Sequence, residues 1–437
     1  MVRRRDAGDG PVWHDAAMTM STRPSDAPPA GIEIRPPRED EQRRFLEPLG
    51  IAFAEEIDDE DYDQHRATLE WDRVFGALDG DRVIGCSGAL TFELTVPGGG
   101  SVATAGVTAV AVRPDQRRRG ILRAMMRRLL DQARERGEPT AALWASEGAI
   151  YQRFGFGLAT IQASFDIDRA RLTFRTPVEP AGSVRLVDID EAARRFPTVY
   201  EFERRRTAGA LSRTDAFWRH HLLVDTTALR GAIGRKHLAA LEVDGVLRGY
   251  AVYRARADWD ERGPKGVLTV LEVLADSPAG ERTLWRWLLD VDLMGTIRAS
   301  RQAVPHPLQL QLLDPRRLGM TVMDGLWLRI LDIPAALEAR AYAAHGRLVL
   351  DIRDGFYPEN DGRWSIEATA GTRRVARSGE PADMRLEISD LAAVYLGTFR
   401  FSQLVQAGRA EELAPNAAAR ADALFAVDRV ASCSTIF

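Results

Sequence analysis

A short basic turn, Arg117, Arg118, Arg119 and Gly120, lies between an apolar run and an amphipathic run. Glycine lets the backbone approach a ligand closely. The free N–H groups and positive dipole at the start of a helix attract phosphate. The turn therefore predicts main-chain binding of the diphosphate of a phosphorylated cofactor. By itself it leaves a second interpretation open, an arginine-rich helix start that is only solvated.

The flanking runs predict the two elements that position this turn. Residues 103–112 carry hardly a polar atom, which is typical of a central strand covered on both faces. Residues 122–133 have apolar side chains along one helical face and charged ones opposite; the apolar positions are Leu122, Met125, Met126, Leu129, Leu130 and Ala133. We expect a buried strand, the basic turn, and a helix that packs on the sheet by one face.

A second group of residues with chemical potential follows about thirty positions later. Residues 140–145 read as another buried strand, and Ser146, Glu147 and the run from Tyr151 to Phe156 come directly after it. The two segments together resemble the R/Q-x-x-G-x-G/A loop and the Y-x-x-x-G-F element of the GCN5-related N-acetyltransferases. Leu122 stands where that loop ends on a small residue, so we expect its side chain to point away from the diphosphate. An ordinary core tyrosine is the alternative for Tyr151.

The resemblance narrows to the Eis (enhanced intracellular survival) acetyltransferases, over nearly the whole chain after about residue 30. It is carried by residues 146–157, by the triple arginine upstream and by the chain end at Phe437. That family implies acetyl-CoA as acetyl donor, a homohexamer, and an α/β (α+β) fold. Each subunit is then expected to hold two tandem acetyltransferase-like domains and a sterol-carrier-like C-terminal domain. Members acetylate amines of aminoglycosides and lysine side chains.

The resemblance also implies a role for each site residue. Tyr151 is expected to act as general acid, and the α-carboxylate of Phe437 as general base. A chain tail that merely docks by its apolar side chain is the alternative for Phe437. The expected acetyl-CoA contacts are Val110, Ala111, Val112, Arg118, Arg119, Gly120, Ile121, Leu122, Arg123, Ser146 and Glu147.

The 437 residues are enough for two or three cores. We expect a disordered leader over residues 1–30, a catalytic domain over 31–172, a degenerate acetyltransferase-like domain over 173–318 and a sterol-carrier-like domain over 319–437. The second domain repeats the strand pattern of the first. Its turn at residues 276–281, however, contains Pro278, which lacks an N–H, and two carboxylates. The sequence therefore predicts one acetyl-CoA site per chain.

Charge and composition restrict the class of protein. The net charge of −4 gives no indication of nucleic-acid binding. Cys86 and Cys433 suggest neither a disulfide framework nor a metal site, so a reduced cytoplasm is the expected location. Residues 1–30 lack the apolar core of a secretory signal and no stretch has the 18 apolar residues of a membrane span, so we expect neither element.

The sequence predicts an acetyl-CoA-dependent N-acetyltransferase that acts on a primary amine of a cationic acceptor in a ternary complex. The acceptor would be aminoglycoside-like, a polyamine or a lysine side chain. An acidic run at residues 55–61 could attract such a cation or could be a solvated loop, and Ile436 stands where some relatives have an acidic residue. The alternative function is a non-catalytic protein that binds an apolar ligand in the sterol-carrier-like domain.

Overall fold

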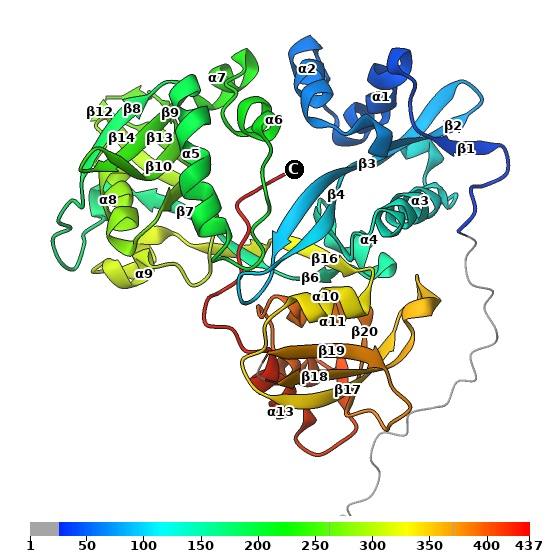
Figure 1. Cartoon of the computed structure of the whole chain (residues 1–437). Coiled ribbons are helices and arrows are strands. Elements are labelled where there is room, and N and C mark those ends of the chain that lie inside the picture. The colour runs from blue at the N-terminus through cyan, green and yellow to red at the C-terminus, as the bar shows by residue number, and fades with distance from the viewer. Residues whose placement is uncertain (1–25, 262, 370) are drawn as a thin grey trace, which may run out of the picture.

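The computed structural model describes residues 26–261, 263–369 and 371–437, so most of the expected leader lies outside the described residues. Three bodies pack together, each built on one main sheet (Figure 1). The chain end rises from the third body and passes between the first two. None of the helices within the described ranges is long and apolar enough to cross a membrane.

The first sheet has the order β1-β2-β3-β4-β5-β16-β6. A two-residue turn with Gly80 at φ 56° joins β2 to β3 in a hairpin. Helix α3 buries the expected apolar stripe against this sheet. The strands are β1 Ile32–Arg35, β2 Val74–Asp79, β3 Arg82–Thr95, β4 Ser101–Val112, β5 Thr140–Trp144, β6 Gly157–Leu158 and β16 Leu326–Ile330. The helices are α1 Gln42–Phe53, α2 Asp59–Thr68, α3 Ile121–Glu135 and α4 Gly148–Tyr151.

The second sheet has the order β15-β7-β14-β13-β10-β9-β8 and repeats the plan of the first. Its strands are β7 Ile161–Asp168, β8 Ser183–Val187, β9 Arg235–Val243, β10 Val246–Arg256, β13 Gly266–Ala275, β14 Met294–Gln302 and β15 Thr321–Asp324, with a small ribbon of β11 Trp259–Asp260 and β12 Gly263–Pro264. The helices are α5 Ile189–Arg204, α6 Asp215–Phe217, α7 Thr227–Ile233, α8 Pro278–Leu289 and α9 Leu308–Gln311, and a π-helical turn spans Trp218–Leu222.

The two sheets exchange strands. The chain crosses into the second sheet between β6 and β7, where β7 pairs with β14 and β15. It returns between β15 and β16, and β16 pairs antiparallel with β5 and β6 of the first sheet. Strand β16 lies within the range 319–437 that was expected for the third domain, but it completes the first sheet. The crossings do not coincide with the expected domain boundaries at 172 and 318, because apolar strand runs show burial but not which sheet buries them.

The third body is a five-stranded sheet of order β19-β18-β17-β20-β21 with helices on it. Its interior is filled by fully buried side chains such as Leu350, Ile366, Leu391 and Tyr395. The strands are β17 Gly346–Arg353, β18 Gly362–Thr369, β19 Thr372–Arg377, β20 Met384–Glu387 and β21 Ala410–Glu412. The helices are α10 Ile333–Ala339, α11 Ile388–Tyr395, α12 Phe401–Gln406 and α13 Ala417–Phe425.

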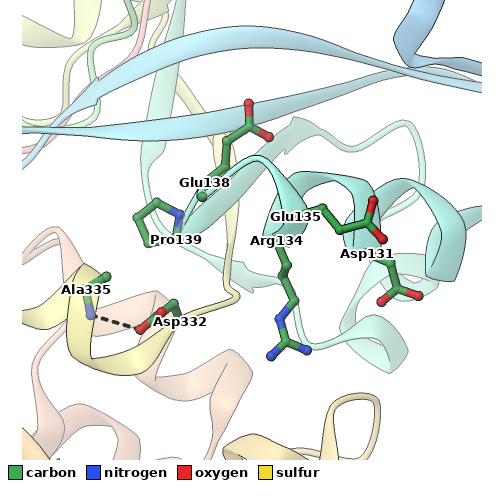
Figure 2. A pocket seen from close by; sticks show the side chains of 8 residues that line it. Asp131, Arg134, Glu135, Glu138, Pro139, Asp332 and Ala335 are labelled. Atoms are coloured by element: carbon green, nitrogen blue, oxygen red, sulfur yellow. Dashed lines mark hydrogen bonds between the residues drawn. The ribbon is translucent and has the colours of Figure 1, made fainter.

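A hollow of about 470 Å³ with acidic walls lies between the end of α3 and the start of α10 (Figure 2). Its charged side chains already have protein partners. Asp131 accepts a hydrogen bond of 2.7 Å from the Tyr357 hydroxyl, and Arg134 pairs with Glu359. Glu138 pairs with Arg73, and Asp332 accepts a hydrogen bond of 2.9 Å from the Ala335 amide. Two of these contacts, Asp131 with Tyr357 and Arg134 with Glu359, join the first body to the third.

Arg73 and Glu138 form a buried ion pair beneath the first sheet, with two hydrogen bonds of 2.8 and 2.6 Å. Replacing Arg73 by methionine leaves the Glu138 carboxylate buried without its cation, so we expect the free energy of unfolding to fall by about 3–5 kcal/mol. Urea titration monitored by fluorescence measures this loss. The Arg73→Met/Glu138→Leu double variant should recover most of it, and a single-variant loss below about 1 kcal/mol would contradict the prediction.

Candidate active site

Strands β4 and β5 separate and open a gap in the first sheet. They pair in parallel only from Thr104 to Gly106 on β4, although β4 continues to Val112. Ala109 has a positive φ of 50°, and the register of β4 against β3 shifts beside it. This β-bulge bends the strand. The backbone of Val110, Ala111 and Val112 therefore lies along an open edge that can hydrogen-bond an extended ligand.

The basic turn leads from this open edge into α3 as an exposed main-chain cradle. Arg118 and Gly120 have φ values of 64° and 84°, and Gly120 caps α3 without any side-chain hydrogen bond. A Cβ added at Gly120 would meet no atom within 4 Å. Leu122 packs on the core, as expected for a side chain that points away from the turn. Such successive amides at a helix start fit a diphosphate.

A cavity of about 600 Å³ lies at the open edge and brings together predicted residues from distant parts of the chain. Val110, Ser146, Tyr151 and Phe437 all line it. The basic turn and Glu147 lie outside its lining. The side chains of Ala111 and Ile121 are buried in the core, so these two residues can offer a cofactor only their main chain.

Tyr151 ends helix α4 and is 6% exposed, with its ring edge-on to Phe156 at 6.0 Å between centroids. Burial raises the pKa of its phenol, the charge of Glu147 raises it further, and the Ser146 hydroxyl acts in the opposite direction. The phenol therefore stays protonated at neutral pH. A protonated hydroxyl that lines a cavity can donate a proton or a hydrogen bond.

Phe437 reaches the cavity from the far end of the chain. Its ring contacts that of Phe92 at 4.9 Å between centroids. A Cβ at position 106 would lie 3.0 Å from the Phe437 ring, so Gly106 leaves room for that ring. Just before it, the Thr435 carbonyl accepts a hydrogen bond of 2.9 Å from Trp144 at the end of β5. The last residue is therefore fixed beside the open edge of β4.

The opposite wall of the cavity comes from α1, α2 and the second domain. Phe53, His65, Phe217, His220 and His221 line it. Within the acidic run only Glu55 belongs to the described lining. Asp58 instead caps α2 through the Asp61 amide at 2.8 Å, and Asp59 pairs with Arg43. The run is thus mainly a helix start, and Glu55 is its contribution to the cavity.

Sequence reasoning missed the aromatic and histidine side chains of this wall. They follow no recognisable spacing in the chain, because they belong to helices of two domains that meet only in the folded protein. His220 and His221 offered one signal, since adjacent histidines are rare in a chain with seven. Among the described residues, no group of three or more His, Cys, Asp or Glu side chains is placed to hold a metal ion. Both cysteines are free and buried.

The corresponding turn of the second domain differs in its chemistry. The Ser277 side chain caps α8 by accepting a hydrogen bond of 3.2 Å from the Gly280 amide, and Pro278 follows without an N–H. Asp276 pairs with Arg248 at 3.0 Å. At this turn the Gly280 amide is therefore already bonded, and residue 278 has no N–H to offer a phosphate.

Comparison with known proteins identifies all three bodies. Residues 33–159 and 209–330 each match a family described as an acetyltransferase (GNAT) domain, and residues 333–434 match the sterol carrier protein domain. The chain is 35% identical over 403 residues to an uncharacterized N-acetyltransferase of Streptomyces avermitilis, which covers 90% of this chain and 96% of that protein.

Two further relatives carry the name Eis. N-acetyltransferase Eis of Mycobacterium tuberculosis is 36% identical over 365 residues, or 81% of this chain and 85% of that protein. The crystal structure of Eis1 from Mycobacterium abscessus superposes with a TM-score of 0.78 at 30% identity, covering 93% of this chain and all of that one. These likenesses extend over both acetyltransferase domains and the sterol-carrier-like domain, and the chain therefore belongs to the Eis family of N-acetyltransferases.

Proposed function

We propose that this protein transfers an acetyl group from acetyl-CoA to a primary amine of a cationic acceptor, by direct attack in a ternary complex. The observation that carries the proposal is the cavity at the open edge of β4, which Tyr151 and Phe437 both line. That cavity also has room for an acceptor beside the strand gap. We propose one such site per chain, because the turn of the second domain is capped by Ser277.

The main chain of the first domain would hold the acetyl donor. The amides from Arg118 to Leu122 would bind the diphosphate, with Arg119 adding positive charge nearby. The predicted contact Arg123 is instead paired with Asp26 at 2.6 Å and lies over the Phe356 ring. The backbone of Val110, Ala111 and Val112 would bond the extended arm of the donor, and Ser146 and Glu147 would border it. Bound acetyl-CoA supplies a thioester whose carbonyl carbon the acceptor nitrogen attacks.

Two side groups of this chain would handle the protons as the C–N bond forms and the C–S bond breaks. Tyr151 would donate its phenolic proton to the departing sulfur. With ordinary pKa values near 10 and 8.5 this transfer is uphill by about 1.5 units, or about 2 kcal/mol, and burial of Tyr151 increases the gap. Such a cost is small beside the barrier of an uncatalysed transfer.

The α-carboxylate of Phe437 would accept the proton that the acceptor nitrogen loses. An ordinary carboxylate near pKa 3.5 cannot remove a proton from an ammonium group near 10.4, because the gap of about 7 units corresponds to about 9 kcal/mol. The acceptor therefore attacks as the free amine, after its ammonium proton has been lost to solvent. The remaining proton becomes far more acidic once the nitrogen bonds to the carbonyl carbon, and its transfer to the carboxylate is then feasible. The carboxylate would therefore act during attack, directly or through a water.

The acceptor would be a polycation such as an aminoglycoside, a polyamine or a lysine side chain. Glu55 lines the cavity and, together with the carboxylate of Phe437, would supply negative charge there. The aromatic wall would contact the carbon skeleton of the acceptor. By likeness to the family we also propose a homohexamer in the cytoplasm, and light scattering would give its mass.

A thiol-release assay with acetyl-CoA and a panel of aminoglycosides, polyamines and lysine peptides tests the proposal. We expect saturable CoA release with at least one polycation, and a product heavier by one acetyl group in mass spectrometry. Calorimetry should show saturable acetyl-CoA binding at micromolar concentration. A protein that binds no acetyl-CoA and releases no thiol with any acceptor would overturn the proposal.

Gly120→Ala tests the diphosphate cradle. The site has space for a methyl group, but φ of 84° costs a residue with a Cβ about 1–2 kcal/mol. We expect the turn to relax and the Kd for acetyl-CoA to rise about tenfold, since 1.4 kcal/mol corresponds to one order of magnitude. Calorimetry measures this change. Gly137→Ala is a matched control, because it also has positive φ and open space but lies at the other end of α3.

A further inference from the structure

The last residues of the chain, Ala431–Phe437, form an extended tail that leaves the third body and follows the second domain to the cavity (Figure 1). We call residues 431–437 the tail. The Ser432 amide donates to the Ala208 carbonyl at 2.9 Å. Ala431, Cys433 and Thr435 are buried, so alternate side chains of the tail point into the protein. One side of the tail is therefore packed against the protein from Ala431 to Thr435.

A buried ion pair of the second domain grips two hydroxyls of the tail. Arg213 and Glu272 pair through bonds of 2.6 and 2.8 Å, and their side chains are 1% and 2% exposed. Ser434 donates to Glu272 at 2.7 Å, and the Thr435 hydroxyl accepts from Arg213 Nε at 2.9 Å. Tyr200 adds a contact of 2.7 Å to the same hydroxyl. We name Arg213, Glu272 and Tyr200 the clamp.

The clamp lies where the second domain repeats the strand gap of the first. Strands β13 and β14 pair in parallel only as far as Val270 and Ala299, although β13 continues to Ala275. The register of β13 against β10 shifts between Val270 and Glu272, as β4 shifts beside Ala109. Glu272 follows that irregularity directly. A second cavity lies at this gap, separate from the one lined by Tyr151, and the tail residues Ser432 and Ser434 line it.

We propose that the second domain uses its strand gap as a binding groove for the chain's own tail, and that Arg213 and Glu272 are positioning residues for Phe437. In the first domain the corresponding gap opens into the cavity lined by Tyr151, whereas the gap of the second domain faces the tail. The clamp binds Ser434 and Thr435, three and two residues before the chain end. It therefore limits how far the terminal carboxylate can move. The catalytic consequence rests on the proposed function, but the grip on the tail does not.

Removing the two tail hydroxyls tests whether the clamp holds the tail, and it leaves no buried charge without its partner. In Ser434→Ala/Thr435→Val the Arg213–Glu272 pair remains and Thr435 keeps its volume. A carboxypeptidase that prefers aromatic ends then measures, in the full-length protein, how fast free phenylalanine is released from position 437. We expect release at least tenfold faster than in the unaltered protein, kcat at least tenfold lower, and Kd for acetyl-CoA within twofold. Thr435→Ser keeps the hydroxyl and should behave as the unaltered protein does.

The outcomes separate the groove from the chemistry. An unchanged rate of phenylalanine release in the double variant would overturn the groove, whether or not the protein is an acetyltransferase. Faster release with unchanged kcat would confirm the grip and would instead overturn the role of the Phe437 carboxylate as base. Glu272→Gln provides a second variant, because it keeps the shape of the clamp but removes one charge. Its rate of phenylalanine release should lie between those of the unaltered protein and the double variant.

Discussion

Tyr151→Phe is expected to lower kcat by about 10²–10⁴-fold while the Kd for acetyl-CoA stays within twofold. The substitution removes a single oxygen from a ring that is held by burial and by Phe156, so the cavity keeps its shape. Without the phenol, the sulfur must leave as a thiolate or take its proton from water. Thiol release at saturating acceptor gives kcat, and calorimetry gives the Kd.

Tyr357→Phe is the matched control. It removes the hydroxyl of a buried tyrosine that donates to Asp131 at 2.7 Å, in the joint with the third body. It should lower the free energy of unfolding by about 1–3 kcal/mol and leave kcat unchanged. A Tyr151→Phe variant with full kcat and weaker acetyl-CoA binding would show instead that the phenol only positions the donor.

Local pattern was sufficient to predict the elements around the donor site. The apolar run before residue 112, the glycine at 120 and the stripe along α3 each depend on neighbours in the chain, and the structure has a strand, a positive φ and a buried helix face there. The repeat after residue 235 was predictable for the same reason, because β9, β10 and β13 alternate and turn as β2, β3 and β4 do.

Contacts between distant segments were not predictable. No residue in strand β7 or β16 specifies which of two similar sheets that strand joins. One residue of the clamp, Glu272, could have been noticed in the sequence, because a carboxylate inside an apolar strand needs a partner when it is buried. Its partner Arg213 lies in a loop 59 positions earlier, among 59 basic residues, and only the fold selects it.

The second large effect is expected at the chain end. Adding one glycine after Phe437 converts its carboxylate to an uncharged amide and moves the charge by about 3.5 Å, the span of one extended residue. We expect kcat to fall by about 10²-fold or more, because a base must lie within hydrogen-bond reach of the proton that it accepts. The assays are the thiol-release and calorimetric ones used for Tyr151→Phe.

Deleting Phe437 separates the carboxylate from the ring. The deletion keeps a terminal carboxylate, now on Ile436, but removes the ring contact with Phe92. If the carboxylate is the base, both variants lose kcat and both still bind acetyl-CoA, because the donor is held by main-chain groups of β4 and α3. If the tail merely docks by its ring, the extended protein keeps full activity and only the deletion fails. Since the clamp fixes Thr435 in either variant, the position of the carboxylate is the variable that the pair of proteins compares.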